Sequence, residues 1–194
     1  TKTARRLLAE SIKFVPTKGR QRGADDTYLE IVKRQADMGD FSAAQATARR
    51  MSIPLERLDA FLLIAQKAAS SPDAKIVASA NNMFEDAFKI AKSHKGEIVE
   101  SADVLLQISN AQIEAKQNAR ALTTLQYLRP RLIKSEFEGQ IDRVSRMAGD
   151  FVLAGDNNTA MGVVRSIGDI ANRAQAMSSV AYSIGAKGNI DAAV

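Results

Sequence analysis

Apolar residues recur at three- and four-residue intervals along most of the chain, as they do on one face of an α-helix. No segment alternates apolar and polar residues with the two-residue period that marks a half-buried strand. The first stripe lies in a helix expected over residues 3–15, which Pro16 ends. The pattern therefore predicts an all-α protein.

Helical stripes continue along the rest of the chain. They predict helices from Thr27, after Gly39, from Pro54, after Pro72, over residues 97–116, from Ala121 to Pro130, over residues 131–154, after Gly155 and from Ile170. Asp25 or Asp26 is expected to cap the helix that starts at Thr27. Gly139 and Gly149 lie inside the helix expected over residues 131–154, and each weakens it by up to about 1 kcal/mol relative to alanine. A bend is therefore expected there.

Two segments 116 residues apart repeat each other. The chain reads GDFSAAQATARRM from Gly39 and GDNNTAMGVVRSI from Gly155, and a shorter copy, GNIDAAV, opens at Gly188. Glycine permits the left-handed conformation that ends a helix, and aspartate caps the next helix. Each Gly-Asp is therefore predicted to form the corner between two helices, with further corners at residues 70–73 and at Lys116. A recurring unit indicates a repeat architecture.

The corner Gly39-Asp40-Phe41-x-x-Ala44, with Tyr28 eleven residues before it, resembles the tetratricopeptide repeat. The resemblance implies an α-solenoid of antiparallel helix pairs, wound as a right-handed superhelix of about four to five irregular repeats. Predicted corners follow one another at intervals of 33, 44, 39 and 33 residues, and the outer two intervals match the family's period of about 34. Gln35 stands where the family has an aromatic residue.

Positive charge gathers at the N-terminus. Residues 1–24 hold seven basic residues against Glu10 alone, a net charge of +6, whereas residues 25–194 carry 20 basic and 21 acidic residues. We therefore predict a basic N-terminal arm or capping helix over residues 1–24, followed by a tetratricopeptide-like helical-repeat domain over residues 25–194.

Catalytic and metal chemistry find little support in the composition. The chain has no cysteine, which excludes disulfides, thiol catalysis and Cys-ligated zinc, and His94 is its single histidine. We expect a protein that is not an enzyme and that needs no cofactor or metal. A chain without cysteine fits the cytoplasm and the periplasm equally, so the compartment stays open.

In the tetratricopeptide family, the first helix of each pair lines a concave groove, and certain positions on it contact bound peptides. One such position corresponds here to Asp26, Asp59, Asp103 and Asp142, and a second to Lys33, Gln66, Asn110 and Gly149. The resemblance implies that these residues bind a basic or extended peptide, whose backbone the two amides suit. The alternative is that Asp59, Asp103 and Asp142 are merely solvated helix positions.

Two functions follow as hypotheses. The first is a non-enzymatic interaction scaffold or adaptor that binds a peptide or a partner domain in the solenoid groove. The second is binding of nucleic acid or an anionic membrane through the basic arm, with contacts from Arg5, Arg6, Lys18, Arg20 and Arg22. The near-neutral body favours the scaffold, because a helical-repeat reader of nucleic acid should be basic along its groove.

The last predicted helix carries an apolar face, formed by Met177, Val180, Ala181 and Ile184. The copy that opens at Gly188 stops at Val194, about one turn into the helix that would cover this face. We therefore expect the repeat domain to continue beyond the C-terminus, or the chain to self-associate through residues 170–194.

Overall fold

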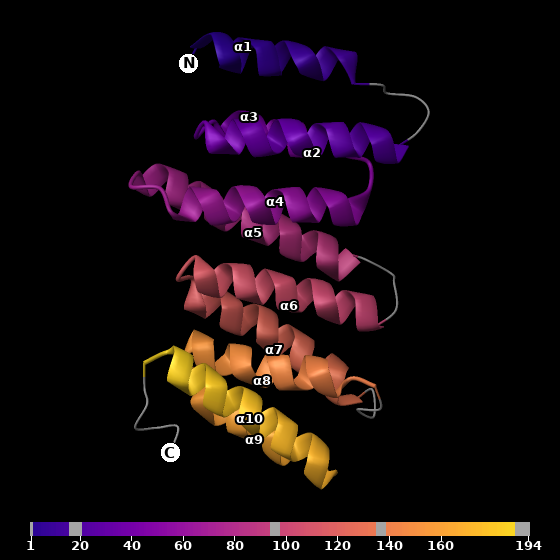
Figure 1. Ribbon diagram of the computed structural model, residues 1–194, viewed down its shortest axis with the longest axis vertical. Coiled ribbons are helices and arrows are strands. Elements are labelled where there is room, and N and C mark those ends of the chain that lie inside the picture. Colours follow the sequence, from indigo (N-terminus) through magenta and orange to yellow (C-terminus); the bar gives the residue numbers. More distant parts are fainter. Residues whose placement is uncertain (1, 16–20, 94–97, 135–138, 189–194) are drawn as a thin grey trace. The chain divides into compact units, whose positions relative to one another are not determined.

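The computed structural model describes residues 2–15, 21–93, 98–134 and 139–188, and all regular structure within these ranges is helical (Figure 1). The predicted all-α class is therefore confirmed. The helices are α1 (Lys2–Ser11), the 3-10 helix η1 (Ile12–Phe14), α2 (Gln21–Asp37), α3 (Phe41–Ala48), α4 (Pro54–Ala69), α5 (Ala74–Ser93), α6 (Ile98–Glu114), α7 (Asn118–Lys134), α8 (Ile141–Ala154), α9 (Asn157–Arg165) and α10 (Ile170–Ala186).

Packing divides the chain into two compact units, unit 1 (Thr1–His94) and unit 2 (Lys95–Val194). In unit 1, α2 packs on α3 and α4 on α5, while α2 and α3 both contact α4. In unit 2, α6 packs on α7 and α8 on α9, and α8 also contacts α6, α7 and α10. The predicted boundary after residue 24 lies within α2, and that domain division stays a prediction.

Three helix pairs turn at the same kind of corner. A residue within two positions of the end of the first helix is left-handed in each, with φ of 70° at Gly39, 58° at Lys116 and 104° at Gly155. The next amide then donates to a carbonyl five residues back, at 2.8 Å each time, from Asp40 to Gln35, from Gln117 to Gln112 and from Asp156 to Phe151. This bond defines the Schellman motif, which satisfies carbonyls at the helix end. The predicted corners at these three positions are confirmed.

Aspartate begins the second helix at two of these corners. Asp40 accepts a hydrogen bond from the amide of Ala43 at 3.3 Å, and Asp156 accepts one from the amide of Thr159 at 2.9 Å. Both bonds satisfy amides that the first turn of a helix leaves without a partner. One Gly-Asp dipeptide thus ends one helix and starts the next.

The cap expected at Asp25 or Asp26 is wrong, because α2 begins at Gln21 and includes both residues. The carboxylate of Asp25 is instead buried and accepts hydrogen bonds from two amides just before α4, that of Ser52 at 2.9 Å and that of Ile53 at 2.7 Å. Asp25 therefore joins α2 to the start of α4.

Pro130 lies inside α7, which continues to Lys134, so the helix expected over residues 131–154 is wrong. The chain breaks later, and α8 begins after Gly139, a left-handed glycine with φ of 72°. Proline removes one backbone hydrogen bond from a helix. Leu128 and Leu132, on either side of it, are buried, and this packing offsets the missing bond.

A buried polar pair joins the two helices at two of the corners. Thr47 Oγ1 donates to Gln35 Oε1 at 2.9 Å, and Thr124 Oγ1 donates to Gln112 Oε1 at the same distance. Each pair spans twelve residues across its corner. Thr47 thus supplies the buried amide of Gln35 with a partner.

We expect Lys116→Gly to raise the free energy of unfolding by about 1 kcal/mol, because a left-handed backbone costs a residue with a side chain about 1–2 kcal/mol. Gly39→Val and Gly155→Val should lower it by about 1–3 kcal/mol for the same reason. Urea unfolding followed by circular dichroism measures all three changes. Unchanged stability in all three variants would contradict the corner assignment.

Candidate functional site

The seven residues predicted to line the groove lie on the first helices of the pairs. They are Asp26 and Lys33 on α2, Asp59 and Gln66 on α4, Asp103 and Asn110 on α6, and Asp142 on α8. Gln66 and Asn110 are half-buried and the other five are exposed. Their role in binding stays a prediction.

Two of the predicted acidic residues connect neighbouring first helices. Arg143 on α8 holds the carboxylate of Asp103 with two hydrogen bonds, of 2.8 and 2.6 Å. Gln175 Nε2 on α10 donates to Asp142 Oδ1 at 2.6 Å. These carboxylates already pair within unit 2, so a cationic ligand would have to compete with their present partners.

The basic residues predicted to contact an anionic partner are only partly within the described ranges. Arg5 Nη2 donates to the carbonyl of Met38 at 3.1 Å, and Arg5 Nε lies 3.7 Å from Asp40 Oδ2. Arg6 Nε lies 4.0 Å from Glu10 Oε1 one turn later. Lys18 and Arg20 lie outside the described residues, and Arg22 belongs to α2 with its side chain outside what is described.

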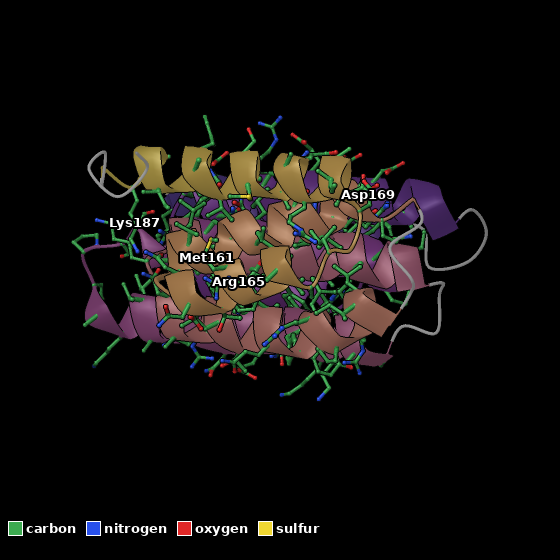
Figure 2. All side chains as sticks on the ribbon, turned by 90° about the horizontal axis from the view of Figure 1, so that it is seen from below. Met161, Arg165, Asp169 and Lys187 are labelled. Atoms are coloured by element: carbon green, nitrogen blue, oxygen red, sulfur yellow. The ribbon has the colours of Figure 1, made fainter. Side chains whose placement is uncertain are left out.

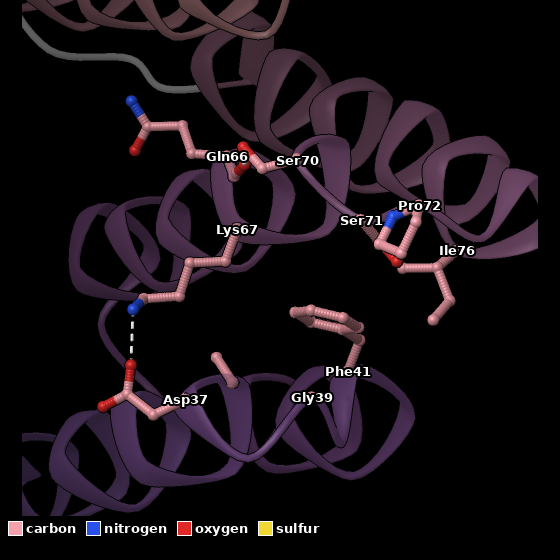
Figure 3. A pocket seen from close by; sticks show the side chains of 10 residues that line it. Asp37, Gly39, Phe41, Gln66, Lys67, Ser70, Ser71, Pro72 and Ile76 are labelled. Carbon is pink, nitrogen blue, oxygen red and sulfur yellow. Dashed lines mark hydrogen bonds and ion pairs between the residues drawn. The ribbon is translucent and has the colours of Figure 1, made fainter.

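A cleft of about 590 Å³ opens in unit 1 where the α2–α3 corner meets the α4–α5 corner, and we call it cleft 1. The ring of Phe41 points into it, with Pro72 and Ile76 on one side and an ion pair of Lys67 with Asp37 on the other (Figure 3). The predicted groove residue Gln66 also lines this cleft. Its walls combine an aromatic ring with polar groups that already have partners.

A second cleft, of about 680 Å³, lies in unit 2 between α8 and α10, and we call it cleft 2. The two helices approach closely at Gly149, where a Cβ atom would lie 2.7 Å from Ser183 Oγ and 3.3 Å from Ser179 Oγ. A Cβ atom here would force the Ser183 side chain to shift, so the close approach of the two helices favours glycine. The predicted groove position held by Gly149 is therefore a helix contact.

Cleft 2 is lined mainly by polar side chains, among them Asp142, Ser145, Arg146, Asp150, Ser178 and Tyr182. Ser145 is 5% exposed, and its buried hydroxyl has no hydrogen-bond partner among the described residues. Leaving a buried polar group without a partner costs about 1–3 kcal/mol. At the rim, the ring of Tyr182 is 80% exposed.

Asp150 brings a buried carboxyl group to the same cleft. Its Oδ2 lies 3.0 Å from Ser109 Oγ on α6, and that hydroxyl also lies 2.9 Å from the carbonyl of Leu106. Burial raises the pKa of Asp150 to about 6, although the hydrogen bond from Ser109 and the charge of Arg146 favour the ionised form. A hydroxyl has one proton to donate. If Ser109 donates to Leu106, a protonated Asp150 completes the network by donating to Ser109.

The apolar face predicted on the last helix is exposed only in part. Val180 is 4% exposed and packs into unit 2, so its inclusion in that face is wrong, whereas Met177 is 49% exposed. In Figure 2, Asp169 and Lys187 mark the two ends of α10. Lys187 Nζ donates to the carbonyl of Val152 at 3.1 Å and so ties the end of α10 to α8. Self-association through this helix stays a prediction.

Within the described ranges, no three histidine, cysteine, aspartate or glutamate side chains come together as a metal site would need. Among the same residues, no helix combines the length and the apolar character needed to cross a membrane. His94 lies outside the described residues.

Sequence reasoning did not identify Ser145 or Asp150. A signal was present, because Ser145 and Gly149 lie one turn apart on a helix whose other face is almost wholly apolar, and this spacing marks a close helix contact. No protein-family model, no curated protein and no solved structure matches this chain. Its likeness to the tetratricopeptide repeat therefore rests on its own corners and helix pairs.

Proposed function

We propose that this chain is a non-enzymatic interaction scaffold of the tetratricopeptide-like, α-solenoid type, and that it binds a partner peptide in cleft 2. The proposal includes about four to five irregular helix pairs wound as a right-handed superhelix. The first helices of the pairs form the binding side.

The order of helix packing within each unit supports this architecture. First helices contact the first helix of the next pair, as α2 does with α4, α6 with α8, and α8 with α10. Second helices also contact the next first helix, as α3 does with α4, α7 with α8, and α9 with α10. Contacts between successive pairs of this kind are what a solenoid requires.

The unpaired hydroxyl of Ser145 is the observation that carries the choice of cleft. Cleft 1 holds polar groups that are already engaged, such as Lys67 with Asp37. In cleft 2, the hydroxyl of Ser145 has almost no exposed surface, so a peptide amide or carbonyl would pair with it once the side chains around it shift, and this pairing would relieve the cost of its burial. Tyr182 at the rim offers an exposed ring that can anchor a side chain of the same peptide.

We expect a phage-displayed library of random peptides, selected on the full chain, to yield binders whose affinity depends on Ser145. Ser145→Ala should weaken binding of a selected peptide about three- to tenfold, the effect of one lost hydrogen bond. The substitution should leave the free energy of unfolding unchanged or slightly higher, because it removes a buried hydroxyl that has no partner. Fluorescence anisotropy with the labelled peptide measures the affinity.

Ser42→Ala is a suitable control, because Ser42 is an exposed serine on α3 in unit 1. This variant should bind the selected peptides as the unaltered chain does. Peptides that bind the Ser145→Ala variant with undiminished affinity would contradict the assignment to cleft 2. A library that yields no binder would contradict the scaffold function itself.

A further inference from the structure

The first helical segment, α1 with η1, leaves two large apolar side chains in solvent. Leu7 is 56% exposed and Phe14 is 84% exposed. They lie seven residues apart, which places them on the same face of a helix about two turns from each other. None of the residues of α1 and η1 is buried. We call the exposed pair the Leu7–Phe14 ridge.

Basic side chains flank the Leu7–Phe14 ridge. Lys2, Arg6 and Lys13 are exposed, and Glu10 is the one acidic residue among residues 1–24. The remainder of the chain is close to neutral. The exposed side of the segment therefore carries two large apolar residues beside basic ones, a combination found on helices that lie in the plane of a membrane surface.

Contacts with unit 1 involve other side chains of the segment. Arg5 bonds to the carbonyl of Met38 and lies near Asp40, and Val15 is buried at the end of the segment. These contacts fix the segment on unit 1 without covering Leu7 or Phe14. The ridge is thus held in place and left open to a partner.

We propose that the Leu7–Phe14 ridge binds an anionic lipid surface. The two apolar side chains would enter the boundary between headgroups and acyl chains, while Lys2, Arg6 and Lys13 would lie among the anionic headgroups. A nucleic acid would also attract the basic residues, but its phosphates offer nothing to an exposed leucine. Complementarity of both kinds, apolar and electrostatic, favours the lipid surface.

Phe14→Trp supplies a direct measurement, because the chain has no tryptophan of its own and residue 14 is exposed. The probe is a suspension of unilamellar vesicles with three parts phosphatidylcholine to one part phosphatidylglycerol. Tryptophan emission should shift to the blue when these vesicles are added to the full chain. The affinity for vesicles of phosphatidylcholine alone should be at least about tenfold lower, since these vesicles carry no net charge that attracts the basic residues.

The double variant Leu7→Glu with Phe14→Glu should lose at least about tenfold in vesicle affinity, measured by co-sedimentation. Its matched control is Ile170→Glu with Met177→Glu on α10, which changes the net charge equally at two residues that are 81% and 49% exposed. All four positions are on the surface, so both variants should keep the circular dichroism spectrum of the unaltered chain.

Three results would overturn the proposal. The first is an unshifted tryptophan spectrum with the anionic vesicles. The second is an equal loss of vesicle binding in the control variant, which would show that net charge alone decides it. The third is tighter binding to a short DNA duplex than to the vesicles, unaffected by Leu7→Glu with Phe14→Glu, which would assign the arm to nucleic acid.

Discussion

Gly149→Leu should lower the free energy of unfolding by about 2–3 kcal/mol, as side chains forced into a packed contact generally do. Even the Cβ atom would lie 2.7 Å from Ser183 Oγ and 3.6 Å from the backbone carbonyl oxygen of Ser179. The serine hydroxyl can rotate away, but the backbone of α10 cannot, so the rest of the leucine side chain must push α10 from α8. Urea unfolding followed by circular dichroism measures the change.

Gly185→Leu is the matched control for this prediction. Gly185 also lies inside a helix, α10, but no atom of the described residues lies within 4 Å of a Cβ placed there. Leucine has the higher helix propensity, so this variant should be more stable by up to about 1 kcal/mol. If both variants were stabilised alike, the close contact between α8 and α10 would be refuted.

Asp150→Asn should raise the free energy of unfolding by about 2–3 kcal/mol at neutral pH. The pKa of Asp150 is about 6 in the folded chain, against about 3.9 for an unfolded aspartate. The folded state therefore holds this proton more tightly than the unfolded state. The stability that the bound proton contributes is complete below about pH 4 and is lost as the pH rises through about 6. Asparagine keeps a donor towards Ser109 at every pH and removes that loss.

Unfolding free energies measured between about pH 4 and pH 8 provide the test. The advantage of Asp150→Asn over the unaltered chain should grow through this range and level off above pH 7. Asp156→Asn serves as the control. Hydrogen bonds from Thr159 lower the pKa of Asp156, so its ionised form stabilises the folded chain and the substitution should lower the free energy of unfolding. A constant difference between Asp150→Asn and the unaltered chain across the range would show that Asp150 does not titrate there.

Local signals in the sequence predicted the corners well. Gly39 and Gly155 could be identified because a left-handed residue followed by an aspartate leaves few alternatives. The prediction that a helix ends at Pro130 was wrong for a related reason. The local preference of proline to end a helix is overridden by the buried leucines on either side of it. Local chemistry therefore decides where the chain turns unless the packing of a whole helix face opposes it.

Contacts between distant residues escaped prediction. The pairing of Asp103 with Arg143 joins residues 40 apart, and the bond from Gln175 to Asp142 joins residues 33 apart. Nothing in either residue's neighbourhood identifies its partner, because the separation of the two helices must be known first. Val180 was likewise assigned to an exposed face, although it is buried, because a helical stripe does not show which of its two edges a neighbour covers.

The buried glutamine–threonine pairs restrict how the chain can misfold. Similar corners let a first helix dock the wrong second helix, as repeated units are prone to do. At the positions of Gln35 and Thr47, the third corner carries Phe151 and Val163, both fully buried. Were α2 to pack on α9, the amide of Gln35 would face Val163 without a partner, at a penalty of about 1–3 kcal/mol. The polar pairs and the apolar pair thus disfavour an exchange of α9 with α3 or α7, whereas α3 and α7 carry the same polar partner.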